Sequence, residues 1–276
     1  MSRRRVVVLG ICAAGTLLLA GCNGFRAASS TFDEDVPVGQ PVSTVRIESG
    51  SGDVRIHTGS KANIHRKVYY QGDKPGATTR FEGNTLVLAE CGQRNCSIDY
   101  ELTLPVAAKV IGEAGSGNIE VVGMSEVGVR AGSGDVTVRN VAGPVTVNTG
   151  SGNAELSGLG QSAVVEVSSG DVRLTDVKGD ATIQAHSGKV TGTNLGGKTS
   201  VDSSSGDVVL SMSAVRNVKA TASSGNIKVQ VPRGENYHVS AVTDSGDESV
   251  NILNDPAGPN LLDLHASSGD ITVDYR

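Results

Sequence analysis

The chain has 276 residues, among them 36 glycines, no tryptophan and 3% aromatic residues, and its formal net charge is −5 at pH 7. The acidic balance excludes the basic surface that nucleic-acid binding requires and a polybasic attachment to anionic lipids. The small number of aromatic residues argues against the stacking platforms that carbohydrate-cleaving enzymes usually combine with paired acids.

The first residues are typical of an exported lipoprotein. Met1–Arg5 is a basic patch, and the apolar stretch Val6–Leu19 is shorter than the about 20 residues of a membrane-spanning helix. Leu19-Ala20-Gly21-Cys22 resembles the bacterial lipobox. The resemblance implies that residues 1–21 are a signal peptide and that Cys22 becomes the lipid-bearing first residue of the mature chain.

Two alternatives concern this signal. It can be an ordinary secretory signal with small residues before its cleavage site, or a twin-arginine signal at Ser2-Arg3-Arg4. Loss of residues 1–21 removes three arginines and no acid, which changes the net charge from −5 to −8. We expect an extracytoplasmic protein held at the cell membrane by the lipid on Cys22, or at the outer membrane in a Gram-negative cell.

The next two segments are expected to link the lipid to a repeated domain and to cover its end. Residues 22–40 have almost no apolar pattern and predict a flexible tether. Residues 41–105 predict an N-terminal β cap, in which Lys61–Tyr70, Ala77–Ala89 and Ser97–Leu104 form antiparallel hairpins.

Cys12 would leave with the signal peptide and Cys22 would carry the lipid, so the free thiols that remain are Cys91 and Cys96. Thiols outside the cytoplasm oxidise, so the pair predicts a disulfide that closes the tip of a hairpin in the cap. Half of a metal site is the alternative, but no second thiol or histidine pair lies near in the sequence.

A repeat occupies residues 106–276. Ser-Gly recurs with its serine at positions 51, 116, 133, 151, 169, 187, 205, 224, 245 and 268, and four successive spacings are 18 residues. Apolar residues alternate before and after each copy, as Val145 and Val147 do before Ser151, which is the pattern of half-buried strands.

This constant phase predicts an all-β parallel β-solenoid, a single-stranded β-helix with coils of about 18 residues. About ten coils at about 4.8 Å each would make a rod some 45 Å long. A β-sandwich is the alternative, since it also has short strands at regular spacing, but it does not require an invariant 18-residue phase.

One known family shares these features. Ser97-Ile98-Asp99-Tyr100-Glu101-Leu102-Thr103-Leu104-Pro105, followed by Gly115-Ser116-Gly117-Asn118-Ile119-Glu120-Val121 and its repeats, resembles the bacterial putative-adhesin β-strand-repeat family. The resemblance covers roughly residues 41–276. It implies the fold more than an activity, because that family has no assigned function.

The residue after each Ser-Gly forms a polar column on stacked coils. The column reads Asn118, Asp135, Asn153, Asp171, Lys189, Asp207, Asn226, Asp247 and Asp270. Calcium needs six to eight converging oxygens, whereas most acids here alternate with Asn or Lys, so we interpret the column as turn structure in which Asp and Asn bond their own backbone. A weak calcium site is the alternative only at Asp244, Asp247 and Asp270.

No residue pattern predicts catalysis. The five histidines lie in different contexts, the glycines precede strands rather than helices, and no cofactor motif is present, so we expect neither an enzyme nor a cofactor. The sequence favours a monomeric envelope protein that displays the solenoid for adhesion, binding or scaffolding, with an envelope protein or glycan as its partner. The alternatives are an envelope-stress sensing module that binds a peptide or protein, and a glycan-active enzyme.

Overall fold

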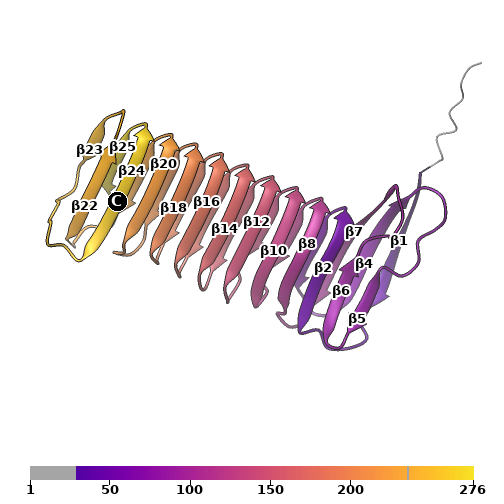
Figure 1. Cartoon of the computed structure of the whole chain (residues 1–276). Coiled ribbons are helices and arrows are strands. Elements are labelled where there is room, and N and C mark those ends of the chain that lie inside the picture. The colour runs from indigo at the N-terminus through magenta and orange to yellow at the C-terminus, as the bar shows by residue number, and fades with distance from the viewer. Residues whose placement is uncertain (1–28, 235) are drawn as a thin grey trace, which may run out of the picture.

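The computed structural model describes residues 29–234 and 236–276, which form 25 strands in two sheets (Figure 1). Cys22 and the expected signal peptide lie outside the described residues. Sheet A has 13 strands in the order β1-β4-β7-β3-β9-β11-β13-β15-β17-β19-β21-β25-β23, and sheet B has 12 in the order β22-β24-β20-β18-β16-β14-β12-β10-β8-β2-β6-β5.

The strands of sheet A are β1 (Ser30–Pro37), β3 (Val54–Thr58), β4 (Asn63–Tyr70), β7 (Cys96–Leu104), β9 (Ile119–Val122), β11 (Val136–Arg139), β13 (Ala154–Leu159), β15 (Val172–Val177), β17 (Val190–Leu195), β19 (Val208–Met212), β21 (Ile227–Val231), β23 (Glu248–Val250) and β25 (Ile271–Tyr275). Those of sheet B are β2 (Thr44–Ser51), β5 (Thr79–Glu82), β6 (Thr85–Ala89), β8 (Lys109–Ser116), β10 (Glu126–Ser133), β12 (Val145–Ser151), β14 (Ala163–Ser169), β16 (Ala181–Ser187), β18 (Thr199–Ser205), β20 (Val218–Ser224), β22 (Tyr237–Thr243) and β24 (Asn260–Ser268).

Each regular coil places one strand in sheet B and, after its Ser-Gly turn, one strand in sheet A. Successive coils pair in parallel and in register, so that Val127 lies beside Val145 in sheet B and Val136 beside Ala154 in sheet A. The predicted parallel β-solenoid is confirmed. A sandwich of antiparallel sheets is excluded, because the neighbours in the regular part of each sheet are parallel strands of adjacent coils.

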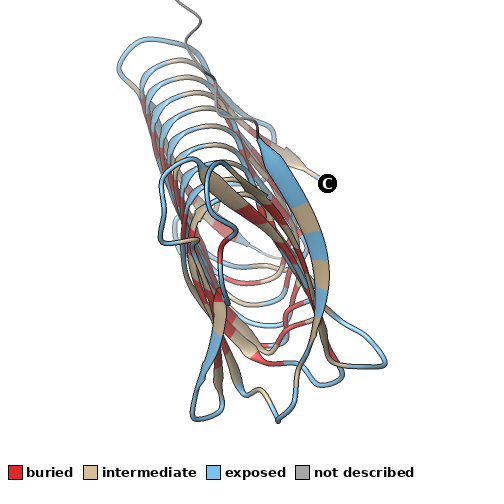
Figure 2. Cartoon of the chain, turned by 90° about the vertical axis from the view of Figure 1, so that its right-hand side faces the viewer, coloured by how far each residue is buried: buried red, intermediate tan, exposed pale blue. Residues whose placement is uncertain are grey.

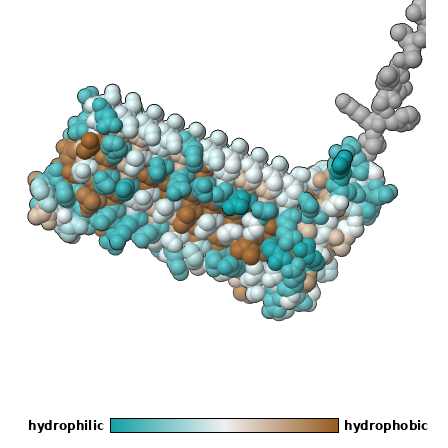
Figure 3. Space-filling view, viewed as in Figure 1, coloured by the Kyte–Doolittle hydropathy of each residue, from teal (hydrophilic) through white to brown (hydrophobic). Residues whose placement is uncertain are grey.

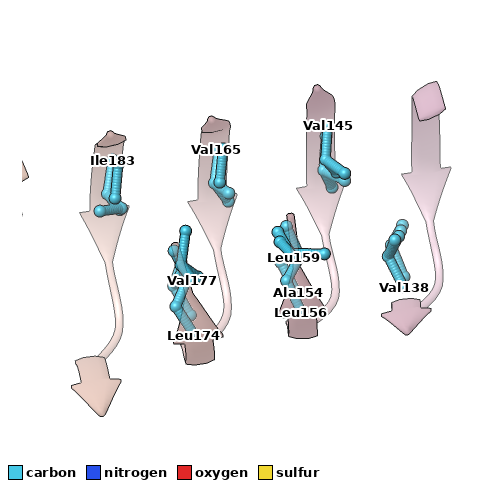
Figure 4. Close-up of a cluster of buried hydrophobic side chains, with 14 of the residues drawn as sticks. Val138, Val145, Ala154, Leu156, Leu159, Val165, Leu174, Val177 and Ile183 are labelled. Carbon is cyan, nitrogen blue, oxygen red and sulfur yellow. The ribbon is translucent and has the colours of Figure 1, made fainter. Parts of the chain in front are cut away.

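The core is the narrow space between the two sheets (Figure 2). Val145, Val165 and Ile183 of sheet B and Leu156 and Leu174 of sheet A are at most 1% exposed and point into this space (Figure 4). The apolar position at the end of each sheet A strand, or two residues after it, closes the far edge and is also buried, in Met124, Val141, Leu159, Val177 and Leu195. Aliphatic side chains suffice because the two sheets lie so close together.

The Ser-Gly turns require glycine for two reasons. The ten turn glycines have φ between 103° and 150°, a region that other residues rarely adopt. They also stack closely on one another, since a Cβ at Gly170 would lie 2.1 Å from the carbonyl oxygen of Gly152. Gly170, with a φ of 141°, therefore needs both the positive φ and the absence of a side chain.

The last two coils do not stack in chain order. β24 and β25 lie directly on β20 and β21, and the earlier strands β22 and β23 form the outermost coil. The chain thus forms the outermost coil first, with β22 and β23. It then returns through the segment 251–259, and β24 and β25 form the coil between the outermost coil and β20 and β21. A simple stack of sequential coils, as the repeat suggests, is wrong at this end.

The cap also differs from the expected set of hairpins. β2 and β3 form a regular coil that pairs directly with β8 and β9, and the cap strands β4–β7 lie beyond it. β5 and β6 do form an antiparallel hairpin, but β6 and β7 pair in parallel with β2 and β3 and belong to different sheets. The cap therefore ends in one irregular coil, and the expected disulfide hairpin is a turn between sheets.

The expected tether is partly folded. β1 covers the edge of sheet A by antiparallel pairing with β4. Phe32 and Val36 pack against the core, while Glu34 between them binds the guanidinium of Arg66 at 2.6 Å. The predicted flexible tether over residues 22–40 is thus wrong from Ser30 onward. The reason is that Glu34, at an inward position, has a buried partner, Arg66, 32 residues away.

Candidate functional site

The polar column after the Ser-Gly turns forms a ladder of hydrogen bonds between coils, with one interruption after Lys189. The Oδ1 atom of Asp135 accepts the backbone N–H of Asn153 at 2.7 Å, and Oδ1 of Asn153 accepts that of Asp171 at 2.8 Å. Each side chain therefore bonds the backbone of the next coil, whereas the sequence interpretation placed this bond within its own turn. Both Asp and Asn suit the position because each offers an acceptor oxygen.

The ladder extends further toward the cap than the sequence column does. Asn118 N–H donates to Asp53 Oδ1 and Asp53 N–H donates to Asp99 Oδ1, both at 2.9 Å. Asp53 follows a Ser-Gly copy, so the pattern was sufficient to find it. Asp99 follows the Cys91–Cys96 loop and has no such signal. Lys189 donates its N–H to Asp171 at 2.8 Å but has no side-chain acceptor for the next coil.

Two of the three candidate calcium residues at the far end, Asp247 and Asp270, take part in the same ladder. Asp270 N–H donates to Asn226 Oδ1 at 2.8 Å, and Asp247 N–H donates to Asp270 Oδ1 at 2.9 Å. Asp244 donates its backbone N–H to the Ala266 carbonyl. Among residues 29–234 and 236–276, these acids do not form a group that could hold a metal ion, nor does any other set of His, Cys, Asp and Glu.

A second ladder runs along the opposite edge and was missed in the sequence. Its members lie five positions after the polar column and have φ between 55° and 74°: Gly123, Asn140, Gly158, Asp176 and Asn194. Gly, Asn and Asp are the residues that tolerate this left-handed conformation, so their recurrence at this offset was a usable signal. The Asn194 amide also donates to Asp176 Oδ1.

The predicted disulfide between Cys91 and Cys96 is present. It lies in the turn from β6 to β7. This turn connects sheet B to sheet A in the cap, as a Ser-Gly turn does in each regular coil. The bridge therefore closes a six-residue turn between the two sheets, and the neighbouring residue Glu90 approaches the bare backbone of Gly50 in the first regular coil.

The outer face of sheet B is hollowed beside this loop. A groove of about 530 Å³ lies over β2, β8 and β10, with the glycines Gly50, Gly115 and Gly132 in its lining. A Cβ at Gly115 would lie 2.6 Å from the Gly50 carbonyl oxygen, and one at Gly132 would lie 2.5 Å from that of Gly115. Tight stacking of the coils therefore keeps these positions free of side chains.

Charged side chains of both signs line the groove. Hydrogen bonds from Arg80 and Arg46, with that from Arg80 the larger cause, lower the pKa of Glu48. Glu113 and Arg130 are neighbours across β8 and β10, and neither forms a hydrogen bond or ion pair with another described residue. The carboxylate of Glu90, which also lines the groove, has no such partner among the described residues either, so two carboxylates and one guanidinium are available to a ligand.

A family model matches nearly the whole chain. The model of the Toastrack DUF4097 family matches residues 36–274. The chain belongs to the Toastrack DUF4097 family. The family resemblance found in the sequence is thereby confirmed.

Two solved structures are similar to this Toastrack chain. One is described as a "putative adhesin" from Bacteroides fragilis NCTC 9343, with 15% identity and a TM-score of 0.45 over 91% of this chain and 99% of that chain. The other is described as a "putative cell adhesion protein" from Clostridium sporogenes ATCC 15579, with 12% identity and a TM-score of 0.30 over 90% of this chain and 100% of that chain. No curated protein matches the Toastrack chain.

The charged side chains of the Toastrack solenoid that are available to a ligand lie on its outer surface. A helix with the length and hydropathy of a membrane span is absent from residues 29–234 and 236–276. The side chains repeated in each coil mostly serve the stacking of the coils, and the groove on the outer face of sheet B holds the available charges of Glu90, Glu113 and Arg130.

Proposed function

We propose that the chain is a non-enzymatic lipoprotein of the cell envelope that displays its β-solenoid for adhesion, binding or scaffolding. The lipobox sequence ending at Cys22 supports the anchor. β1 enters the fold at the cap end, and the C-terminal coils lie at the opposite end of the rod (Figure 1). A lipid on Cys22 would therefore hold the cap nearest the membrane and direct the C-terminal coils away from it.

The groove on sheet B is the observation that carries the binding proposal. The Asp and Asn side chains of the ladder form hydrogen bonds between coils, so the repeat itself leaves few polar side chains available to bind a partner. Glu113 and Arg130, in contrast, flank a glycine-lined groove and have no partner in the described chain. An extended polypeptide of an envelope protein, or a glycan with polar and charged groups, would fit such an open groove.

A capture experiment tests this function. The exported protein is immobilised and exposed to envelope proteins and wall glycans, in parallel with the variant Glu113→Lys/Arg130→Glu and the control Asp202→Lys. Asp202 lies in the same outward column of sheet B, several coils away. We expect one class of partner to be retained by the wild type and the control and lost by the double variant. Equal retention by all three proteins, or a glycan product, would overturn the proposal.

A sensing role is a second candidate, because the groove and the disulfide turn share a wall. Glu90 lines the groove and directly precedes Cys91. Reduction of the disulfide would free the turn that positions Glu90, and ligand binding would then report an envelope redox stress. Partner capture before and after reduction tests this role, and we expect weaker capture by the reduced protein. Unchanged capture after complete reduction would exclude it.

A further inference from the structure

The outermost coil is only partly closed around its core. In the coil beneath it, Leu264, Ile271 and Val273 are at most 1% exposed. The equivalent inward positions of the outermost coil hold Ala241, Glu248 and Val250, of which Val250 is 37% exposed. We call this end of the rod, where Ala241, Glu248 and Val250 hold the inward positions of the outermost coil, the C-terminal opening.

Apolar surface gathers around this end. Of the seven large hydrophobic side chains exposed in the described part of the chain, four belong to residues 236–276: Val242, Val250, Leu253 and Leu261. Figure 3 shows brown, apolar atoms at the end of the molecule that carries these coils. The concentration at one end is notable because monomeric proteins generally keep large exposed apolar patches for binding.

The two sheet edges at this end differ in how they are closed. The Asn254 side chain donates to the Val239 carbonyl at 3.1 Å and accepts the Val239 N–H at 2.9 Å, and the Glu248 carboxylate accepts the Thr243 N–H at 2.8 Å. These bonds occupy the outer edge of β22 at Val239 and Thr243. Side chains thus replace part of a neighbouring strand along sheet B.

The edge of sheet A remains open. β23 is its terminal strand and bonds β25 on one side, through the Asp247 carbonyl and the Asn251 N–H. Backbone groups alternate in direction along a strand, so the N–H and C=O of Glu248 and Val250 point away from β25. An unpaired edge with apolar side chains beside it is a template for another strand.

The net charge at this end indicates which kind of segment could bind to the edge of β23. Residues 236–276 contain seven acids and one basic residue, Arg276, which gives a net charge of −6. Asp263 and Asp274 have lysine partners, but Asp244, Asp247, Glu248 and Asp255 have no ion pair within the described residues. A second copy of this end, or an anionic lipid surface, would be repelled, whereas a basic segment would be attracted.

We propose that the C-terminal opening binds an extended segment of a partner protein in which lysine or arginine alternates with apolar residues, and that this segment adds as a strand to β23. Its apolar side chains cover Val250, and its basic side chains face the acids around the opening. The site lies at the other end of the rod from the sheet B groove, so either proposal can fail while the other stands.

Binding of a synthetic peptide to the full exported protein tests this inference. The probe is a labelled Lys-Val-Lys-Val-Lys-Val-Lys peptide followed by fluorescence anisotropy, and Glu-Val-Glu-Val-Glu-Val-Glu is its acidic counterpart. We expect saturable binding of the basic peptide that weakens with salt, and no binding of the acidic one. Failure of the basic peptide to bind, or equal binding of both peptides, would overturn the proposal.

Three variants separate the parts of the site. Asp244→Asn/Asp247→Asn removes two charges whose side chains make no bonds in the described chain and should weaken binding about fivefold. Val250→Pro removes one outward N–H and should weaken it about tenfold or more. The control Glu155→Gln/Asp202→Asn removes the same charge from the middle of the rod and should leave binding unchanged. Equal losses in the control and the Asp244/Asp247 variant would contradict the proposed location.

Discussion

The carboxylate of Asp135 accepts the backbone N–H of Asn153 one coil further along the rod, at a distance of 2.7 Å. Asn153 accepts the N–H of Asp171 in the same way, so each turn is held by the side chain of its neighbour. This relationship explains why Asp and Asn exchange freely in the column, and it assigns the repeated acids to the stacking of coils.

The ladder predicts different outcomes for two substitutions of Asp135. Asp135→Asn keeps an acceptor oxygen and should change the free energy of unfolding by only a few tenths of a kcal/mol, about the range of neutral surface changes. Asp135→Ala leaves the Asn153 N–H without its partner and should cost about 1 kcal/mol. Chemical denaturation of the two variants measures this difference, and equal stabilities would contradict the structural role of the ladder.

The turn glycines predict a large effect of a side chain. Gly170→Val forces a β-branched residue to φ +141° and brings its Cβ to 2.1 Å from the Gly152 carbonyl oxygen. We expect a loss of about 3 kcal/mol or more, because neither the backbone nor the neighbouring coil can yield. Gly39→Ala is the control, since no atom lies within 4 Å of its added Cβ. A thermal melt in which both variants match the wild type would refute the stacking argument.

The attachment of β1 depends on Arg66. Its Nη2 atom lies 2.6 Å from Glu34 Oε1, and its Nη1 atom donates to Thr78 Oγ1 at 2.7 Å. Arg66→Met should release the edge strand and destabilise the cap by about 3 kcal/mol, because partners of a buried charge lose their bonds. Hydrogen exchange of the amides of residues 30–37 is the measurement. Protection equal to that of the wild type would show that the pair does not hold β1.

Tyr100 predicts a loss of stability at high pH. Burial raises its pKa to about 12, and its hydroxyl donates to the Ala89 carbonyl at 2.7 Å. An exposed tyrosine in the unfolded chain ionises near pH 10, so the unfolded state releases this proton first as the pH rises. The stabilisation is therefore complete below about pH 10 and decreases between about pH 10 and 12, by about 2 to 3 kcal/mol. Tyr100→Phe should remove this part of the pH dependence, and an unchanged profile would contradict the assignment.

Much of the fold follows from local sequence. Apolar residues alternate before and after each Ser-Gly turn, as Val145 and Val147 do before Ser151. This alternation predicts directly where the strands lie and which face of each strand points inward. The 18-residue phase then specifies which strands become neighbours. Prediction fails where a partner is distant, as for Glu34 and Arg66, because an inward acid by itself indicates a solvated segment.

The order of the last coils and the position of the binding surfaces are harder to predict from the sequence. Asp247 and Asp270 follow the same Ser-Gly pattern, and nothing local states that the later one lies beneath the earlier one. The groove depends on glycines from three coils and on the charges of Glu113 and Arg130 beside them. Those charges become neighbours only through the register of β8 and β10.

The central claim is that the ladder stacks the coils while the face of sheet B recognises the partner. Binding of labelled Asp135→Asn and Glu113→Lys/Arg130→Glu proteins to isolated envelopes, with the wild type alongside, tests it most directly. The account predicts that the Asp135→Asn protein binds as the wild type does and that the double variant loses binding. Loss of binding by the Asp135→Asn protein, with binding by the double variant retained, would contradict it.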